Sequence, residues 1–546
     1  MPFVGEIFAQ LKAAGSTPVL QEIRDGQITA VTGSELIELV RRARTFLASK
    51  SLAKGERCGL LASNSVRWIA MDLAAIAEGL IVVPLYYRQA PHELVAMMKD
   101  STPALVCCGD PNLREGIQQN WSAAPPHFLF DEIFAGVDGI SLDRPQVRSE
   151  DPVTIIYTSG TSGEAKGVVL TAANVGFMLG CTSARLDLLM GGGRTSRDRI
   201  FHYLPFSFCA SWIAVLTFLL RGSLVTLNTD LTKIPNDMPA VAPHYFLNVP
   251  QLLERMRRGV DEQIAAKGGV AQAIYSRAKA AWFGQGGEAT SIWLWLAKRL
   301  VFPQIRKKMV GENLKALICG SAPLTPETQS YFAMLGIPVL QVYGLTETTG
   351  ICTMDDPQNP VPGRVGPAIP GIEMKLSDND EILVRGPNVF PGYWHRPQQT
   401  AEVLGGGWFH TGDQGEIDAT GTWRIVGRIK NLIVLGSGHK IAPESIEDEI
   451  ARLLPAAQQV VIVGNGRGYL TAVVTGDVSR DQVQAALDGV NAQNPHYKQI
   501  RAFCVRPEPF SIDNGMLTAN GKLKRDLISK RMSSEIEDMY QAVKTA

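Results

Sequence analysis

Residues 157 to 167 read Tyr157-Thr158-Ser159-Gly160-Thr161-Ser162-Gly163-Glu164-Ala165-Lys166-Gly167, a loop rich in glycine and hydroxyl residues. The loop follows Val153–Tyr157, a β-rich run, and its backbone N–H groups, hydroxyls and Lys166 suit the β- and γ-phosphates of a nucleotide. It lacks the Gly-Lys-Ser/Thr ending of a P-loop, which disfavours a P-loop nucleotide triphosphatase. Taken alone the loop is weak evidence, because most loops of this composition are turns.

Two further β-rich runs have the same form. Leu314–Cys319 and Val339–Val342 each end in a loop that contains glycine or serine, and helical stretches separate them. This alternation predicts an α/β fold with parallel strands, in which ligands bind at the carboxyl ends of the strands. Thr325 followed by Pro326 predicts a helix start, and Asp418–Trp423 predicts a hairpin around a Thr-Gly pair.

The pattern after Arg428 is that of a compact α+β unit. A helical pattern covers Ser445–Leu454, strand-like runs cover Val460–Val463 and Leu470–Val474, and Ser479 opens another helix with a capping box. No internal repeat is found. We therefore predict a boundary at 427–431, between a large N-terminal domain of layered α/β subdomains at 1–426 and a small C-terminal α+β domain at 432–546; the resemblance described below implies that 427–431 is a hinge and that the small domain is mobile.

The composition is that of a globular protein. The 546 residues are 45% hydrophobic and 19% charged, which allows large cores and leaves little room for long disorder. The formal net charge is zero, so the overall charge gives no attraction to nucleic acid. Eight cysteines without a CxxC spacing argue against the common zinc patterns and give no disulfide framework, so a reducing, cytoplasmic location is expected.

One segment has features of a membrane-surface helix. Ser291–Met309 combines tryptophan, leucine and isoleucine with five basic residues. The alternative is a helix packed on the core with a solvated basic flank, and it is favoured by about two to one. The start, Met1–Glu6, lacks the basic and apolar runs of a signal peptide. The longest apolar run, Trp212–Leu220, is far short of the roughly 20 residues that a membrane span needs.

The 157–167 loop is the first of several motifs that occur in a fixed order. After it come Tyr343–Thr348 (Tyr-Gly-Leu-Thr-Glu-Thr), Trp408–Asp413 (Trp-Phe-His-Thr-Gly-Asp), Gly427–Asn431 (Gly-Arg-Ile-Lys-Asn) and a turn at Thr518–Arg525. With these motifs the chain resembles the superfamily of AMP-forming acyl-CoA synthetases, peptide-synthetase adenylation domains and luciferases, over essentially its whole length. It looks most like the long-chain fatty-acyl-CoA synthetases.

The resemblance implies roles for residues around ATP. Glu347 would hold Mg²⁺, Thr346 would contact the α-phosphate, and Lys522 would neutralise charge that develops between the carboxylate and that phosphate. Read without the family, Glu347 is a helix-start carboxylate and Lys522 a surface lysine. The nucleotide-binding positions are the phosphate-loop residues Thr158, Ser159, Gly160, Thr161, Ser162, Gly163 and Lys166, then Gly320, Ser321, Ala322, Pro323, Tyr343 and Gly344 on the adenine side, and Asp413 and Arg428 at the ribose.

The resemblance also implies a second half-reaction. Family members rotate the small domain after adenylation, so that a thiol acceptor reaches the acyl group. The hinge position matches Lys430, a lysine typical of the fatty-acyl types, and Ser437 and Gly438 would line the path of the pantetheine arm. ATP, Mg²⁺ and CoA are therefore expected as cofactors, and the oligomeric state is left open.

The acid is inferred from the same resemblance. Cys209 stands where amino-acid-activating members place an aspartate, and Val249–Glu254 looks like a stretch of the long-chain branch. A medium- to long-chain fatty acid is therefore expected. One alternative is a fatty acyl-AMP ligase that loads an acyl carrier protein, disfavoured because Thr349–Gly371 leaves no obvious room for the insertion of those enzymes. Others are a non-catalytic acyl- or adenylate-binding regulator and a luciferase-like oxygenase. The joint presence of the predicted site residues argues against the regulator.

Overall fold

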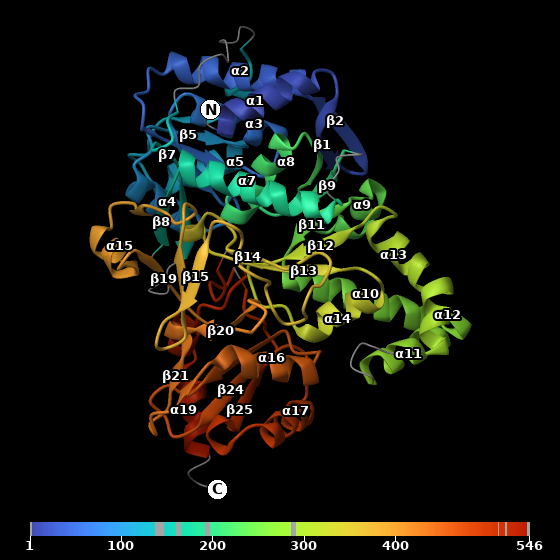
Figure 1. Cartoon of the computed structure of the whole chain (residues 1–546). Coiled ribbons are helices and arrows are strands. Elements are labelled where there is room, and N and C mark those ends of the chain that lie inside the picture. The colour runs from blue at the N-terminus through green and yellow to red at the C-terminus, as the bar shows by residue number, and fades with distance from the viewer. Residues whose placement is uncertain are drawn as a thin grey trace.

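The computed structural model describes residues 3–136, 147–159, 165–191, 197–284, 291–511, 513–518 and 521–542. Two large sheets and their helices form the upper part of the view in Figure 1, and the C-terminal residues, in orange and red, form a separate lobe below them. A smaller sheet of residues 373–428 lies between this upper part and the C-terminal lobe. The predicted class, a mixed α/β fold with layered sheets and a C-terminal α+β unit, is confirmed.

The first sheet has the strand order β14-β13-β12-β11-β9-β10-β1-β2. Its inner strands run parallel, as the sequence predicts for 314–319 and 339–342, and β2 and β14 add antiparallel edges. The N-terminal β1 pairs in parallel with β10, far along the chain. The strands are β1 (Pro18–Arg24), β2 (Gln27–Thr32), β9 (Arg199–His202), β10 (Leu224–Asn228), β11 (Tyr245–Asn248), β12 (Ala316–Cys319), β13 (Val339–Tyr343) and β14 (Thr353–Met354).

The second sheet has the order β17-β8-β7-β4-β3-β5-β6. Here the predicted loop at 157–167 is shorter than expected, because Thr158 and Ser159 end one strand and Lys166 lies on the next, with Thr158 opposite Lys166 in an antiparallel pair. The strands are β3 (Arg57–Leu61), β4 (Ile81–Leu85), β5 (Leu105–Cys108), β6 (His127–Leu129), β7 (Pro152–Ser159), β8 (Ala165–Thr171) and β17 (Gly392–Tyr393).

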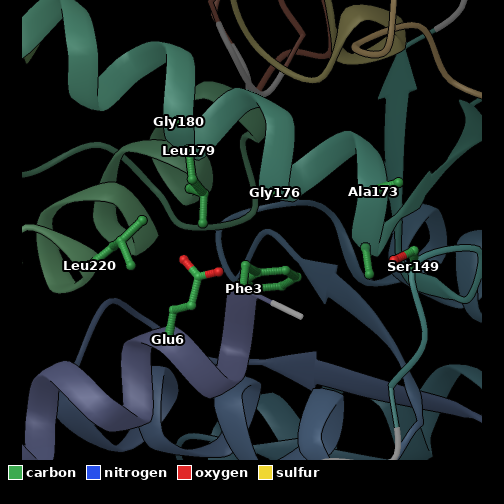
Figure 2. Close-up of a pocket in the computed structure, with 9 residues that line it drawn as sticks. Phe3, Glu6, Ser149, Ala173, Gly176, Leu179, Gly180 and Leu220 are labelled. Atoms are coloured by element: carbon green, nitrogen blue, oxygen red, sulfur yellow. The ribbon is translucent and has the colours of Figure 1, made fainter. Parts of the chain in front are cut away.

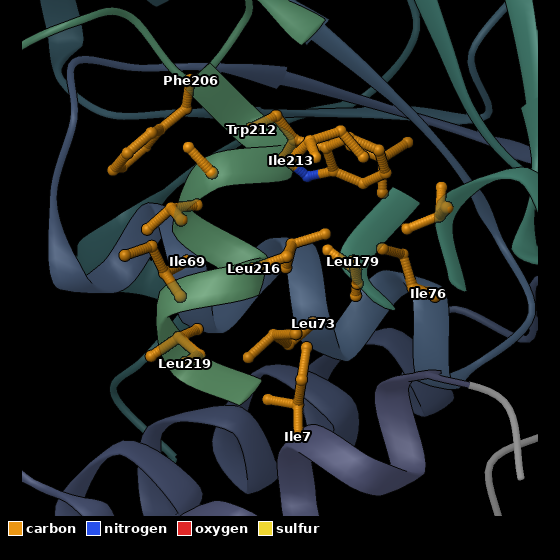
Figure 3. Packing of buried hydrophobic residues seen from close by; sticks show 14 of the residues in the cluster. Ile7, Ile69, Leu73, Ile76, Leu179, Phe206, Trp212, Ile213, Leu216 and Leu219 are labelled. Atoms are coloured by element: carbon orange, nitrogen blue, oxygen red, sulfur yellow. The ribbon is translucent and has the colours of Figure 1, made fainter. Parts of the chain in front are cut away.

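Helices that are apolar on almost every side fill the space between these two sheets. Figure 3 shows Trp212, Ile213, Leu216 and Leu219 of α8 packed among Ile69, Leu73 and Ile76 of α3 and Leu179 of α7, all buried. An all-round apolar helix belongs in the core of a large protein. The helices of this part are α1 (Phe3–Ala14), α2 (Gly33–Ser49), α3 (Val66–Ala77), α4 (Pro91–Ser101), α5 (Pro111–Asn120), α6 (Phe130–Ile133), α7 (Ala172–Leu189), α8 (Cys209–Leu220) and α9 (Ile234–Val241).

An insertion between β11 and β12 forms a helical arm at the right-hand edge of Figure 1. The single helix expected at 291–309 is wrong, because Pro303 lies in the first turn of a second helix, where it cannot continue the helix before it. Thr325 caps the helix predicted after it and accepts a hydrogen bond from the Thr328 N–H at 3.3 Å. The helices of the insertion are α10 (Pro250–Lys267), α11 (Gly269–Gly284), α12 (Ile292–Leu300) and α13 (Phe302–Val310), and α14 (Pro326–Met334) follows β12.

The smaller sheet of residues 373–428 consists of antiparallel strands. Two motif residues, Asp413 and Arg428, lie opposite each other on neighbouring strands of it. The predicted hairpin is confirmed, with the Gly421 N–H donating to the Asp418 carbonyl at 3.0 Å. Its elements are β15 (Glu373–Leu376), β16 (Glu381–Arg385), α15 (Pro397–Val403), β18 (Leu404–Gly405), β19 (Trp408–Ile417) and β20 (Trp423–Arg428).

The C-terminal lobe has its own apolar core of buried side chains from strands and helices. The helix predicted at 445–454, the two strands after it and the capping box at Ser479 are confirmed. The division at 427–431 and the mobility of the lobe stay predictions. The elements are β21 (Ile433–Val434), β22 (Lys440–Ile441), α16 (Pro443–Leu453), β23 (Gln459–Val463), β24 (Leu470–Thr475), α17 (Arg480–Gln493), the 3₁₀ turn η3 (His496–Lys498), β25 (Ile500–Arg506), α18 (Arg525–Arg531) and α19 (Ser533–Ala542). Two other 3₁₀ turns lie outside the lobe: η1 (Thr346–Thr348) follows β13, and η2 (Ile429–Asn431) follows β20.

Candidate active site

Two adjacent strand ends form one wall of the site. β12 and β13 run parallel with Cys319 opposite Gln341, so the loops that follow them meet at the same edge. Gly320 packs so closely that a Cβ there would lie 2.6 Å from the Val342 Cγ2 atom. Gly344 is tighter still, with a Cβ position 2.0 Å from the Gly350 carbonyl oxygen. Both positions require glycine for steric reasons. The exposed residues Ser321, Ala322 and Pro323 continue the first loop.

Asp413 is held between two donors at the predicted ribose position. It lies on β19 opposite Arg428 of β20, whose Nε is 3.0 Å from the Asp413 Oδ1. The Tyr343 hydroxyl donates to Oδ2 at 2.8 Å. Burial raises the pKa of Asp413, and Arg428, Tyr343 and Lys522 oppose that rise. A carboxylate has about four acceptor sites, so it can receive further donors from a ligand.

Glu347 lies on η1, one turn beyond β13, beside Thr346. The Tyr393 hydroxyl donates to the Glu347 Oε1 at 2.9 Å, and the Lys166 ammonium lies 5.2 Å from the centre of the Tyr393 ring. Burial raises the pKa of Glu347, and the hydrogen bond from Tyr393 and the charge of Arg428 oppose the rise. Tyr393 therefore links the Glu347 carboxylate, which follows a strand of the first sheet, to the Lys166 ammonium of the second sheet.

The residues present fit Mg²⁺ held chiefly by a nucleotide. Within the described ranges no group of three or more His, Cys, Asp or Glu side chains could enclose a metal ion. Mg²⁺ usually keeps waters and is bound through one or two carboxylates and phosphate oxygens. A lone, partly buried carboxylate such as Glu347 matches that mode.

The turn that carries Lys522 reaches the same place from the C-terminal lobe. Its Thr518 N–H donates to the Lys522 carbonyl at 2.8 Å, and Gly521 has a φ of +74°. A Cβ on Gly521 would lie 3.4 Å from the Gln251 Nε2 atom at the start of α10. The turn thus lies beside α10 of the N-terminal part.

Electrostatics place the Lys522 ammonium near the two carboxylates. Desolvation, followed by the charge of Arg428, lowers its pKa, whereas Asp413 and Glu347 act to raise it. The side chain keeps an exposed surface although protein surrounds its charged end. Lys524, the other lysine of the turn, pairs instead with Glu93 of α4 at 3.3 Å. The geometry therefore favours Lys522 over Lys524 for a role in the site.

Family models match both parts of the chain. A model described as AMP-binding enzyme matches residues 8–394, and one described as AMP-binding enzyme C-terminal domain matches residues 430–544. The chain belongs to the family of AMP-binding enzymes.

Relatives of this AMP-binding enzyme share its length. The long-chain-fatty-acid–CoA ligase FadD15 of Mycobacterium tuberculosis is 28% identical, over 96% of this chain and 94% of its own. Long-chain-fatty-acid–CoA ligase 5 of Mus musculus is 28% identical, over 91% and 83%. Among solved structures, ATP-bound MatB from Rhodopseudomonas palustris is 25% identical with a TM-score of 0.74, covering 98% of this chain and 99% of that one.

Some predicted residues of this AMP-binding enzyme lie apart from the cluster. Ser437 and Gly438 belong to the turn between β21 and β22 in the C-terminal lobe, where the Ser437 hydroxyl is 2.9 Å from the His439 Nδ1. Lys430 lies on η2, two residues after Arg428. Thr158 and the backbone of Ser159 end β7, and the predicted residues Gly160, Thr161, Ser162 and Gly163 lie outside the described residues.

The sequence did not point to three residues that complete the arrangement. Tyr393 orients Glu347, Gln251 contacts the lysine turn, and Glu93 pairs with Lys524. Each reaches the site through pairing of distant segments, as when β17 adds Tyr393 beside β8. The sequence held one local signal for Tyr393, the glycine directly before it. A Cβ on Gly392 would lie 2.7 Å from the Thr400 side chain.

A separate cavity of about 260 Å³ lies between α1, α7 and α8, and Figure 2 shows the Glu6 carboxylate beside Phe3 at its floor. Its other lining residues come from α7, with Ser149 and Leu220. None of the predicted site residues lines it, so it is distinct from the nucleotide site.

Proposed function

We propose that the chain activates a fatty acid with ATP to give acyl-AMP and pyrophosphate, and then transfers the acyl group to CoA, giving acyl-CoA and AMP. The chain is then an AMP-forming acid–thiol ligase that uses ATP, Mg²⁺ and CoA. The observation that carries the proposal is that the lysine turn of the C-terminal lobe lies against the N-terminal part, with Gly521 beside Gln251 and Lys524 paired with Glu93 at 3.3 Å, and that the charges of Asp413 and Glu347 act on Lys522. Full-length relatives named long-chain-fatty-acid–CoA ligases support the same activity.

In the first half-reaction the residues divide the work of binding and charge compensation. Asp413 and Arg428 are fixed against each other at 3.0 Å, and we assign them to the ribose hydroxyls. Thr346 and Lys166 flank the phosphates. The Lys522 ammonium lies where it can stabilise the negative charge that passes from the acid to the α-phosphate. Glu347 would hold Mg²⁺, which would supply electrostatic stabilisation of the phosphates.

A medium- to long-chain acid fits the residues at the start of α8. Cys209 is buried, as are its neighbours Phe206 and Trp212, and a thiol at this position supplies no negative charge to the ammonium group of an amino acid substrate. His202 is packed, with its Nε2 atom 2.9 Å from the Ser211 hydroxyl, and burial lowers its pKa to about 4. A neutral, enclosed histidine of this kind serves packing.

The second half-reaction needs the C-terminal lobe to move. We propose domains at 1–426 and 432–546 joined by the hinge at 427–431, in which Lys430 absorbs the change in backbone angles. Rotation would withdraw Lys522 and bring Ser437 and Gly438 toward the acyl group. Gly438 has a φ of +85° and open space around its Cβ position, which suits close approach of a thiol arm.

The test is ATP–pyrophosphate exchange with a panel of fatty acids and amino acids, followed by detection of the CoA thioester. Exchange with a fatty acid and a CoA product support the proposal. Exchange without a thioester, and transfer to an acyl carrier protein, would replace it with the ligase alternative. No exchange with any acid would favour the binding-protein alternative.

A reducing compartment such as the cytoplasm fits the cysteines. All eight are free, and the buried Cys58 and Cys107 thiols share a hydrogen bond, with their Sγ atoms 3.9 Å apart, and form no disulfide. Among the residues that the structure describes, no helix combines the length and the apolar character needed to cross a membrane.

A further inference from the structure

The helix α12 exposes large apolar side chains on the face that is polar in an ordinary surface helix. It buries Leu294 and Ala297 against its neighbours. Its opposite face exposes large apolar side chains: Ile292 is 62% exposed, Trp295 57% and Leu300 52%. Residues three and four apart share a helix face, so Ile292, Trp295, Lys298 and Arg299 form one strip, and Leu300 adds exposed apolar surface at the end of the helix. We call Ile292, Trp295, Lys298, Arg299 and Leu300 the α12 face.

The charge around this face differs from that of the whole chain. The formal net charge of the chain is zero, yet the sequence from Gly269 to Val310 has seven basic residues and one acidic residue, Glu288. Lys279 and Lys307 have acidic partners, Asp261 and Glu312. The basic residues are Arg277, Lys279, Lys298, Arg299, Arg306, Lys307 and Lys308.

The arm holds the α12 face clear of the nucleotide site. Figure 1 shows α11 and α12 at the outer edge of the molecule, beyond α10 and α13. The inner end of α10 carries Gln251, which contacts the lysine turn. A surface bound at the tip of the arm would therefore leave the C-terminal lobe free to move.

We propose that the α12 face docks on a lipid surface that carries anionic headgroups. Exposed tryptophan and isoleucine beside lysine and arginine are the side chains of an interfacial helix, where apolar groups enter the lipid and cations stay at the headgroups. α11, α12 and α13 have no Asp or Glu in their described residues, so nothing on them repels an anionic surface. The docking is independent of turnover, and its test needs no activity.

The experiment is co-sedimentation of the full chain with vesicles of phosphatidylcholine alone or mixed with phosphatidylglycerol. The wild-type chain is expected to bind the mixed vesicles, and binding is expected to weaken in high salt. Ile292→Ser/Trp295→Ser, and separately Lys298→Glu/Arg299→Glu, should each lower the partition constant by at least about tenfold. The matched control is Ile28→Ser/Leu188→Ser, which removes apolar side chains that are 45% and 58% exposed elsewhere and should bind as wild type.

Thermal melting and ATP–pyrophosphate exchange with a short, water-soluble acid show that each variant is folded. Equal binding by wild type and both α12-face variants would overturn the proposal, and so would failure of wild type to bind mixed vesicles. If chromatography shows a dimer that the α12-face variants lose, the face joins two copies of the chain and lipid docking is wrong. Vesicle binding without any exchange would instead leave the docking intact and refute the proposed function.

Discussion

At the scale of single residues, Lys522 joins the two halves of the chain. Its ammonium is brought into the field of Asp413 and Glu347 by a turn whose backbone is closed by Thr518. A cation that meets developing charge in a desolvated site is worth far more than a surface lysine. Its neighbour Lys524 has the ordinary kind of contact, a partly exposed ion pair with Glu93.

Lys522→Ala should therefore lower ATP–pyrophosphate exchange by about 10²- to 10³-fold. Lys524→Ala should change it by less than about fivefold, since a partly exposed ion pair contributes about 1 kcal/mol or less. Isotope exchange with purified protein measures both. Equal losses in the two variants would contradict the assignment of Lys522.

Tyr393 is a positioning residue, because its hydroxyl donates to the Glu347 carboxylate and so holds its orientation. Tyr393→Phe removes a hydrogen bond to a carboxylate, worth about 1.5–3 kcal/mol. We expect exchange to fall by roughly 10- to 100-fold, with a higher Mg²⁺ concentration needed for half-maximal rate. A fall in rate at unchanged Mg²⁺ dependence would mean that Tyr393 acts on packing alone.

At the scale of elements, a buried hydrogen bond joins α3 to α8. The Trp212 Nε1 donates to the Asp72 Oδ2 at 2.9 Å, while the Asp72 Oδ1 is buried with no partner among the described residues. Burial raises the pKa of Asp72 to about 7, against an ordinary 3.8. The folded state therefore binds this proton more tightly than the unfolded state does.

The sign of the pH effect follows from that shift. Stability from the protonated Asp72 is fully present below about pH 4 and is lost as the pH rises through about 7, at a cost of up to about 4 kcal/mol. Asp72→Asn should gain Tm relative to wild type as the pH rises across this window, measured by thermal melting in a pH series. Asp481→Asn, an exposed change on α17, is the control and should run parallel to wild type. A constant offset between Asp72→Asn and wild type would refute the assignment.

Local patterns predicted most elements and missed those fixed by distant contacts. Thr325 and Ser479 mark helix starts through bonds within one turn, and apolar runs such as 339–342 mark buried strands, so the sequence carried both. It did not carry the antiparallel pairing of β7 with β8, which shortened the phosphate loop, nor the break between α12 and α13. In the candidate site, the sequence identified the residues that belong to motifs. It missed Tyr393, because that residue reaches the site only through the pairing of β17 with β8.

At the scale of the whole molecule, the C-terminal lobe is docked with its lysine turn on the N-terminal part. Gly521 lies against Gln251, and Lys524 pairs with Glu93. This arrangement suits adenylation, because Lys522 is at the carboxylates. It does not suit thioester formation if the lobe must rotate.

A short bifunctional thiol reagent bridging Glu93→Cys and Lys524→Cys should hold this arrangement. The bridged protein is expected to keep ATP–pyrophosphate exchange and to lose CoA thioester formation, which cleavage of the linker restores. Cys181→Ser and Cys504→Ser remove the native thiols that are not fully buried. Undiminished thioester formation in the bridged protein would show that no rotation is needed.

The pairing of β1 with β10 has a consequence for synthesis. β1 and β2 are the first strands to leave the ribosome, yet the partner of β1 at residues 224–228 is made about 200 residues later. At about 5–20 residues per second, the hairpin waits roughly 10 to 40 seconds with one edge unpaired. Nascent chains that stop before β10 therefore expose the unpaired edge of β1. Once β10 is made, it joins the hairpin to β9, and β11 to β14 extend the sheet later in synthesis.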